Sequence, residues 1–319
     1  MKRISIVFKN GIGSVSLLSA ILILFISLSG CKQGKAPADK PVLAVSYDAQ
    51  KYILEQIAGP DYEIKVLLPP GSDPEMYEPD MRTMSAIEDA DIYFSTFTLG
   101  FEDRMATTLS QNYPDLKILN VSTGIDEIKG THTGMAEGVL GNKNTSAESE
   151  DGGHSHGHAH VTDPHLMTSI GNIRIIAKNM LTGLSNQYPD NKEVFQKRYD
   201  VLNDSLQTYS NRLDSIMAPL RGKSFVVMHP AMSYFARDYG MHQVSLEKDG
   251  KEASPRQLRE RLDEAASAQP LVLFYEKGHG DNSVASMASQ LGISAHPINF
   301  EGADFLQEIE SAARVLQRK

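Results

Sequence analysis

The sequence predicts an α/β protein with two lobes, each built on a mainly parallel sheet flanked by helices, and one long rigid helix that joins them. Short apolar segments alternate with helical segments over residues 42–122, and a second alternating set follows over residues 222–319. Strands that alternate with helices favour a parallel sheet covered on both faces. Between the two sets, apolar residues recur with a period of 3.5 residues, which indicates one stripe along a single helix.

The first lobe is placed at residues 42–184. Its expected strands are residues 42–47, 62–69, 91–97 and 116–122, and its expected helices are residues 48–59, a short helix ending at Asp89, and residues 166–184. Residues 126–163 interrupt this pattern, because they are rich in Gly, Ser, Asn and acidic residues and offer little to bury. They predict a mobile surface loop.

The connecting helix is placed at residues 185–221, with its core over residues 191–218. It would be about 42 Å long at 1.5 Å per residue. A coiled-coil dimer is the competing interpretation, but four heptads between two α/β segments favour packing within one chain, and we expect a monomer. The stripe consists of Phe195, Tyr199, Leu202, Leu206, Tyr209, Leu213, Ile216 and Leu220.

The second lobe is placed at residues 222–319. Its expected strands are residues 224–229 and 270–276, and its expected helices are residues 231–240, 254–268, 282–292 and 302–317.

Residues 1–30 predict a signal peptide. Three basic residues and no acidic one precede an apolar run that is too short to be a good membrane-spanning helix. The run ends in LSGC, and Cys31 is the only cysteine of the chain. This segment resembles a bacterial lipoprotein signal, which implies lipidation of Cys31 and attachment to a membrane on its extracytoplasmic side. Residues 31–41 are small and polar and predict a tether.

The net charge of the mature chain limits the classes of partner that it can bind. Without residues 1–30 the chain keeps 28 basic and 40 acidic side chains, and so has a net charge of −12. Such a surface disfavours nucleic acid and favours cations. With Cys31 lipidated, no thiolate is left for a disulfide or a metal site, so metal ligands must be nitrogen and oxygen atoms.

Candidate ligands lie where strands end. Binding sites in open parallel sheets lie beyond the carboxyl ends of the strands. His229 and Glu276 each end a predicted strand of the second lobe, and Glu75 lies in the loop after the second strand of the first lobe. His165 precedes a predicted helix. Two lobes that contribute such residues from opposite sides could close on a metal ion.

Several motifs occur in order along the chain: PPGSDPEMYEPD (69–80), DPHLMTS (163–169), HPAMSYFARDYGM (229–241) and EASPRQLRERLDEA (252–265). In these motifs the chain resembles the zinc- or manganese-binding solute-binding lipoproteins of bacterial ABC importers. The resemblance covers essentially everything after Cys31. It implies a binding protein, not an enzyme, that holds a divalent ion between two lobes and delivers it to an ABC permease in the cytoplasmic membrane.

The resemblance implies that His165 and His229 are metal ligands. The family's loop motif usually carries a histidine ligand where this chain has Glu75. Glu75 either coordinates in its place or faces away, in which case His279 would complete three imidazoles. The fourth ligand position varies in the family, and the candidates here are Glu276, His279, Asn299 and Asp304.

Four further histidines, His154, His156, His158 and His160, alternate with small residues in the predicted mobile loop. A mobile chain cannot fix one geometry, but it can offer several imidazoles transiently, so we expect an auxiliary metal-collecting loop. Such a loop is frequent in the family's zinc importers. Imidazole clusters favour Zn²⁺ whereas the carboxylate of Glu75 favours harder ions, so we predict Zn²⁺ with Mn²⁺ as the alternative.

Two other functions use similar residues. A zinc hydrolase also combines two histidines and a glutamate with an open metal position, but the chain has no HExxH and no GxSxG motif. A periplasmic zinc chaperone would need the same binding site and differs only in its recipient.

Overall fold

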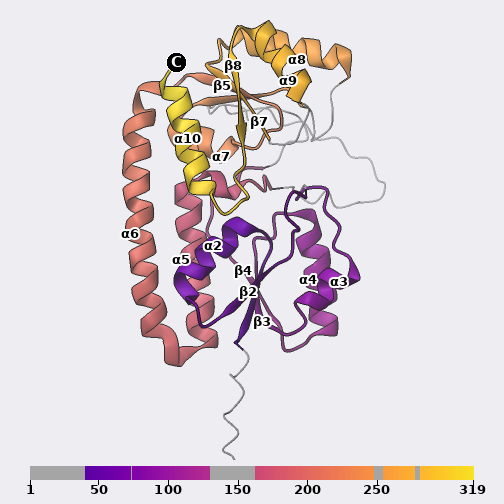
Figure 1. Ribbon diagram of the computed structural model, residues 1–319, viewed down its shortest axis with the longest axis vertical. Coiled ribbons are helices and arrows are strands. Elements are labelled where there is room, and N and C mark those ends of the chain that lie inside the picture. The colour runs from indigo at the N-terminus through magenta and orange to yellow at the C-terminus, as the bar shows by residue number, and fades with distance from the viewer. Residues whose placement is uncertain (1–39, 73, 130–161, 248–253, 277–280) are drawn as a thin grey trace, which may run out of the picture. The chain divides into compact units, whose positions relative to one another are not determined.

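The computed structural model describes residues 40–72, 74–129, 162–247, 254–276 and 281–319 (Figure 1). The chain divides into Met1–Lys40 and one compact unit, Pro41–Lys319, to which the following elements belong. The predicted signal peptide and Cys31 lie outside the described residues. Within the described part, no helix is long and apolar enough to span a membrane.

The first sheet has four parallel strands in the order β2-β1-β3-β4. They are β1 (Val42–Val45), β2 (Glu63–Val66), β3 (Ala90–Ser95) and β4 (Lys117–Asn120). α2 (Asp48–Ala58) and α5 (Ile170–Gln187) lie on one side of this sheet, and α3 (Met81–Ala86) and α4 (Gly100–Asn112) lie on the other (Figure 1). The inner strands β1 and β3 are almost entirely buried, as expected for a parallel sheet covered on both faces.

The second sheet is also parallel and repeats this order as β6-β5-β7-β8. Its strands are β5 (Ser224–Val227), β6 (His242–Ser245), β7 (Val272–Glu276) and β8 (Ser294–Ile298), and its helices are α7 (Ser233–Tyr239), α8 (Pro255–Ser267), α9 (Asp281–Leu291) and α10 (Phe305–Gln317). Alternate residues of β5 enter different cores. Val226 packs in a small core with α8 and α9, whereas Phe225 and Val227 join a larger core.

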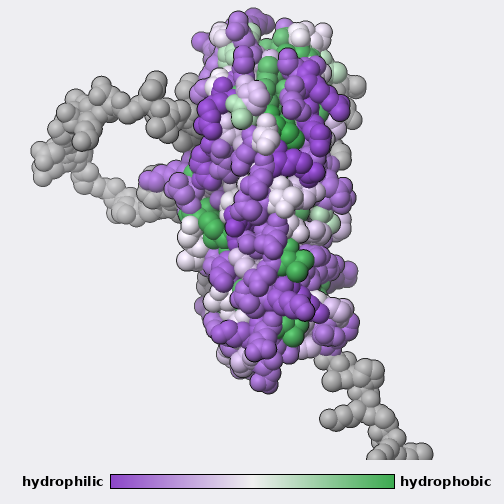
Figure 2. Space-filling view, turned by 90° about the vertical axis from the view of Figure 1, so that its left-hand side faces the viewer, coloured by the Kyte–Doolittle hydropathy of each residue, from purple (hydrophilic) through white to green (hydrophobic). Residues whose placement is uncertain are grey.

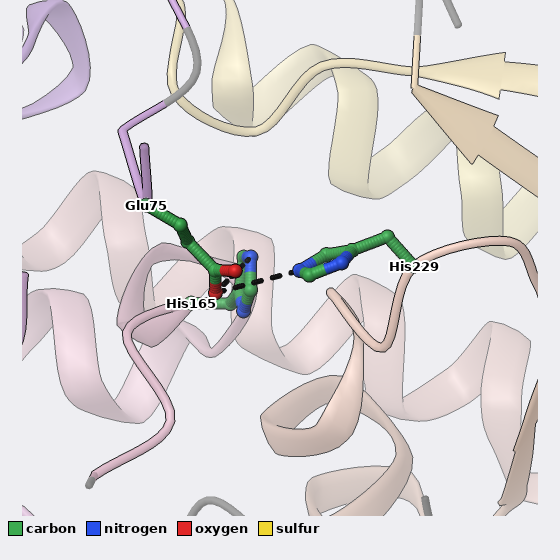
Figure 3. A group of neighbouring side chains, drawn as sticks. All are labelled: Glu75, His165 and His229. Atoms are coloured by element: carbon green, nitrogen blue, oxygen red, sulfur yellow. Dashed lines mark ion pairs between the residues drawn. The ribbon is translucent and has the colours of Figure 1, made fainter. Parts of the chain in front are cut away.

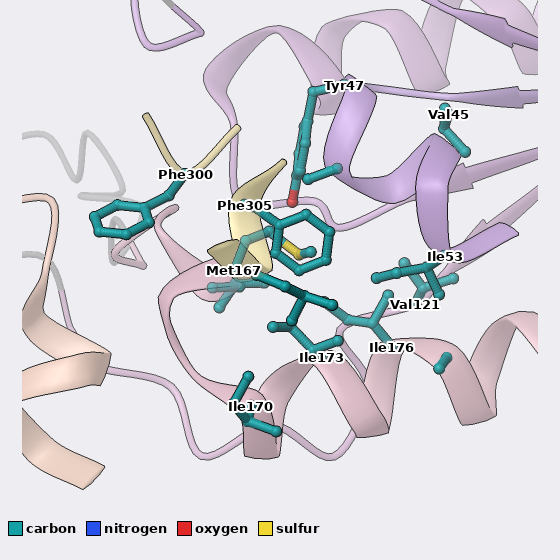
Figure 4. Close-up of a cluster of buried hydrophobic side chains, with 14 of the residues drawn as sticks. Val45, Tyr47, Ile53, Val121, Met167, Ile170, Ile173, Ile176, Phe300 and Phe305 are labelled. Atoms are coloured by element: carbon teal, nitrogen blue, oxygen red, sulfur yellow. The ribbon is translucent and has the colours of Figure 1, made fainter. Parts of the chain in front are cut away.

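The larger core contains residues from helices of both lobes. Phe305, the first residue of α10, lies in one cluster with Met167 and with residues of α2 and α5 (Figure 4). Its ring centroid is 5.7 Å from that of Tyr52 on α2. This packing fixes the start of α10 against the first lobe.

The long helix α6 (Lys192–Met217) packs against α5, α2 and α10 of the same chain, so its apolar stripe is buried within the molecule. It is shorter than the predicted 185–221. Residues 185–187 end α5, and Pro189, which has no N–H to donate, begins a 3₁₀ turn before α6. The surface over α6 is mostly hydrophilic (Figure 2), and its exposed valines, Val194 and Val201, are isolated.

Three elements were missed by the sequence analysis. β6 (HQVS) and β8 (SAHPI) are edge strands in which polar residues or proline interrupt the apolar ones, so they carry no continuous apolar run. α4 buries Phe101, Met105 and Leu109, but its fourth buried residue is Glu102, which weakens the apolar pattern. The carboxylate of Glu102 accepts hydrogen bonds from the N–H groups of Thr96, Thr98 and Leu99, at the start of the helix.

The predicted mobile loop 126–163 has fixed ends. Lys129 and Thr162 form an antiparallel bridge, and the N–H of Asp163 donates to the carbonyl oxygen of Ile128 at 2.9 Å. Residues 126–129 and 162–163, which were predicted as parts of this loop, are thus joined to each other by backbone pairing. Residues 130–161, with the four alternating histidines, lie outside the described part of the chain.

Replacing Gly183 with alanine is expected to lower the free energy of unfolding by about 1 kcal/mol. Alanine normally stabilises a helix by about 1 kcal/mol relative to glycine. Here its Cβ would lie 2.6 Å from Leu119 Cδ1 and 2.8 Å from Phe94 Cε1, and overpacking of this kind costs about 1–3 kcal/mol. Gly171→Ala in the same helix is the control, because its Cβ would meet only Ser169 Oγ at 3.5 Å. Urea unfolding in which both variants gain stability would contradict this prediction.

Candidate metal centre

A cavity of about 240 Å³ lies where the carboxyl ends of strands from both sheets meet. In the first sheet, β2 lies on one side of β1 and β3 lies on the other, and β6 and β7 flank β5 in the same way in the second sheet. The direction of the chain across the sheet reverses at this point, and open parallel sheets bind ligands at such switch points. The wall contains the turn after β1, the loop after β2, the end of β7 and the segment after β8. The lining residues are Tyr47, Asp48, residues 68–72, Pro74, His165, Ala231, Glu276 and residues 298–302.

Beside this cavity, which His165 lines, three of the predicted ligands, Glu75, His165 and His229, point toward one another (Figure 3). His229 Nε2 lies 3.4 Å from Glu75 Oε1, and His165 Nε2 lies 4.0 Å from the same oxygen. The two imidazole centroids are 5.1 Å apart. One donor atom from each of the three residues lies within 4.8 Å of the other two. Residues far apart in sequence thus form one compact group.

Local structure explains how each side chain reaches this group. Glu75 lies in the proline-rich loop between β2 and α3. His165 immediately precedes the 3₁₀ helix Leu166–Thr168. His229 follows β5 and is followed by Pro230, and its carbonyl oxygen accepts a hydrogen bond from the N–H of Ala231 at 2.7 Å, so the chain turns sharply there.

Each imidazole is held by a carboxylate on its Nδ1 side. Asp163 Oδ1 lies 2.9 Å from His165 Nδ1 and also accepts a hydrogen bond from the N–H of His165 at 2.9 Å. Glu247 Oε2 lies 3.3 Å from His229 Nδ1. This arrangement turns both Nε2 atoms toward Glu75, and His229 Nε2 is buried without a hydrogen-bond partner among the described residues. Carboxylate-held imidazoles with a free second nitrogen are typical of metal sites.

The electrostatics of the group favour positive charge. Burial by itself lowers the pKa of His229, but Glu247, Glu75 and the charge of Glu276 outweigh it and raise that pKa to about 10. Burial likewise opposes protonation of His165, whose pKa is nevertheless raised by Asp163. The pKa of Glu75 is lowered, because the two imidazoles outweigh the effect of its burial. The site therefore holds protons where a cation could replace them.

The donor set fits zinc. Zinc binds imidazole nitrogen and carboxylate oxygen at about 2.0–2.2 Å, so two donors on one tetrahedral ion lie about 3.4 Å apart. His229 Nε2 lies 3.4 Å from Glu75 Oε1, whereas His165 Nε2, at 4.0 Å, would move closer to that oxygen on binding. Three protein donors leave one position of a tetrahedral ion open.

The other predicted ligands differ in position. Glu276 lines the cavity, and its charge acts on His229. Asn299 also lines it, but its Oδ1 accepts from two backbone N–H groups, of residues 301 and 302, at 3.3 Å each. Asp304 is exposed immediately before α10 and does not belong to the group formed by Glu75, His165 and His229. His279 lies outside the described residues.

The sequence analysis missed the two carboxylates that orient the imidazoles. Asp163 stands two residues before His165 in the DPH motif, so its proximity was a usable signal. Glu247 follows β6, which was itself missed, and only the pairing of β6 with β5 brings it beside His229.

Comparison with known proteins agrees with this geometry. Residues 43–318 match the family model described as zinc-uptake complex component A, periplasmic. The zinc-binding lipoprotein AdcA of Streptococcus pneumoniae is 27% identical over 290 residues, which cover 89% of this chain and 54% of that protein. The high-affinity zinc uptake system protein ZnuA of Bacillus subtilis is 23% identical, with 92% of this chain and 89% of that protein covered. The chain thus spans about half the length of the streptococcal relative.

The fold comparison points the same way. A crystal structure of ZnuA superimposes with a TM-score of 0.74 at 25% identity, and covers 88% of this chain and 99% of the other. The predicted architecture of two parallel-sheet lobes and one long helix is therefore confirmed, and the match spans nearly the whole described chain. This chain belongs to the family of periplasmic zinc-uptake complex components.

Proposed function

We propose that this chain is an extracytoplasmic, high-affinity zinc-binding protein that captures Zn²⁺ and delivers it to an ABC permease in the cytoplasmic membrane. The observation that carries the proposal is the convergence of Glu75, His165 and His229 with both Nε2 atoms turned toward the carboxylate. The zinc-binding names of its relatives support the choice of ion. Membrane attachment would come from a lipid on Cys31.

In this proposal Glu75, His165 and His229 are the protein ligands. Glu276 is the candidate for the fourth position, since it lines the same cavity and its charge already acts on His229. Zinc would replace protons on the imidazoles, so the metal ion and protons compete for the same ring nitrogens.

Manganese is the second candidate, and the observation that favours it is Glu75. A carboxylate in place of an imidazole hardens the site. Against this, two of the three converging donors are imidazole nitrogens, which favour zinc. Competition between Zn²⁺ and Mn²⁺ on protein purified without added metal separates the two.

Replacing His165 or His229 with alanine is expected to weaken zinc binding by at least about 100-fold, since losing only an outer-shell partner typically costs 10–100-fold. The measurement is competition against a chromophoric chelator. His242→Ala is the matched control, because His242 is exposed on β6 and should leave the affinity unchanged. Wild-type affinity in both ligand variants would remove the proposed site.

Zinc binding at neutral pH is expected to release protons, and the apparent affinity should rise with pH. The pKa of His229 is about 10 in the metal-free protein, so its ring is protonated at pH 7, whereas zinc needs the neutral ring. Calorimetry in two buffers of different ionisation enthalpy measures the number of protons released. Glu247→Gln should lower the pKa of His229 and reduce that number. A binding enthalpy that is the same in both buffers would refute this mechanism.

Deleting residues 152–160 is expected to leave the tight site intact and to remove only weaker additional zinc binding. The reason is that the four alternating histidines are proposed to collect metal, while His165 and His229 hold it. Metal analysis after dialysis at limiting and excess zinc gives both stoichiometries. Loss of the tight site in the deletion variant would show that the two groups of histidines have been wrongly separated.

A further inference from the structure

The hydroxyl of Tyr234, on α7, lies between two segments of the chain, residues 126–129 and residues 162–165, the second of which contains His165. It donates a hydrogen bond to the carbonyl oxygen of Asp163 at 3.0 Å and accepts one from the N–H of Ile128 at 3.2 Å. The side chain of Tyr234 is fully buried, and burial raises the pKa of its hydroxyl, so the donated proton is kept at neutral pH. Tyr234 thus holds the backbone of the residue whose carboxylate orients His165.

Two further residues of α7 attach the same region. Arg237 Nη1 donates to the carbonyl oxygen of Asp126 at 2.6 Å. Asp238 accepts a hydrogen bond from the hydroxyl of Ser169, whose side chain also caps α5. The 3₁₀ helix between His165 and Ser169 packs directly against α7. Hydrogen bonds therefore attach the chain to α7 both before and after His165.

His229 is joined to the same helix along the chain. Only residues 230–232 separate it from Ser233, where α7 begins. The N–H of Met232 donates to Gln243 Oε1 at 2.8 Å, which ties this short connection to β6. The ring of His229 is in turn held by Glu247, at the end of the same strand.

Glu75 is attached elsewhere. In its loop, the ring of Tyr77 packs edge-on against Phe101 with centroids 5.4 Å apart, and Glu78 pairs with Arg104 at 2.6 Å. Both partners belong to α4 of the first lobe. Displacing this loop relative to α7 would remove the carboxylate and leave the two imidazoles together.

We propose that α7 holds His165 and His229 as one preassembled pair, that Tyr234 is the residue that positions His165 in it, and that Glu75 completes the site. The inference rests on the proposed zinc function and deepens it, since it separates a fixed two-imidazole half of the site from a carboxylate on another element. Tyr234 acts only through His165 and is not a ligand.

Tyr234→Phe removes the hydroxyl and keeps the ring. It is expected to weaken zinc binding about ten-fold, at the lower end of outer-shell effects. It should also alter the visible d–d spectrum of the Co²⁺-substituted protein, because the position of one imidazole on the ion changes. Tyr239→Phe is the matched control on the same helix, since the Tyr239 hydroxyl makes no hydrogen bond within the described part of the chain. Thermal unfolding of the metal-free variants measures any separate effect on folding.

A double-mutant cycle then identifies the residue through which Tyr234 acts. In a Glu75→Gln background, Tyr234→Phe should weaken Zn²⁺ binding by the same factor as in the unmodified protein, because the two residues act on different halves of the site. In a His165→Ala background it should have no further effect on the residual binding.

Unchanged zinc affinity and an unchanged Co²⁺ spectrum in Tyr234→Phe would overturn the inference. So would a lower unfolding temperature with an unchanged spectrum, since that would show a purely structural role. If instead His165→Ala itself binds zinc normally, the proposed function fails rather than the positioning role of Tyr234.

Discussion

The pairing of each imidazole with a carboxylate is the interaction on which the metal centre depends. Asp163 and Glu247 fix the Nδ1 sides, which leaves both Nε2 atoms facing Glu75. Buried carboxylates are costly unless they are paired with positive charge. In the metal-free protein protons on the imidazoles supply such charge, above all on His229, whose pKa is raised to about 10. A Zn²⁺ ion that displaced protons would meet the same carboxylates, so they would stabilise both forms.

The two sheets bring these groups to one place. Both sheets have the same parallel order, and each therefore delivers its loops at one edge. The core then fixes one edge against the other, because Phe305 of α10 packs against Tyr52 of α2. A cavity between loops can hold side chains within ångströms of one another only if the elements beneath it are fixed in this way. The buried stripe of α6, which touches α2, α5 and α10, extends this support along the molecule.

Much of this arrangement was predictable from the sequence, and the failures have physical causes. The strands of the first sheet and α6 were predicted because their apolar patterns are continuous, whereas β6 (HQVS) and β8 (SAHPI) were missed because polar residues or proline interrupt them. The missed β6 also hid Glu247. The rule that sites lie at strand ends brought out His229 and Glu276, but it gives the edge of a sheet and not the direction of a side chain.

Glu75 changes the character of the centre more than a simple exchange of ligands would. A neutral imidazole in its place would add no negative charge, and so would not raise the pKa of His229 as Glu75 does. The carboxylate therefore has two opposing effects. It attracts the dication, and it also strengthens the hold of the imidazoles on the protons that the dication must displace. Because proton release becomes easier as pH rises, the attraction would dominate at higher pH, and the proposed centre would couple zinc capture to pH more strongly than an all-imidazole site would.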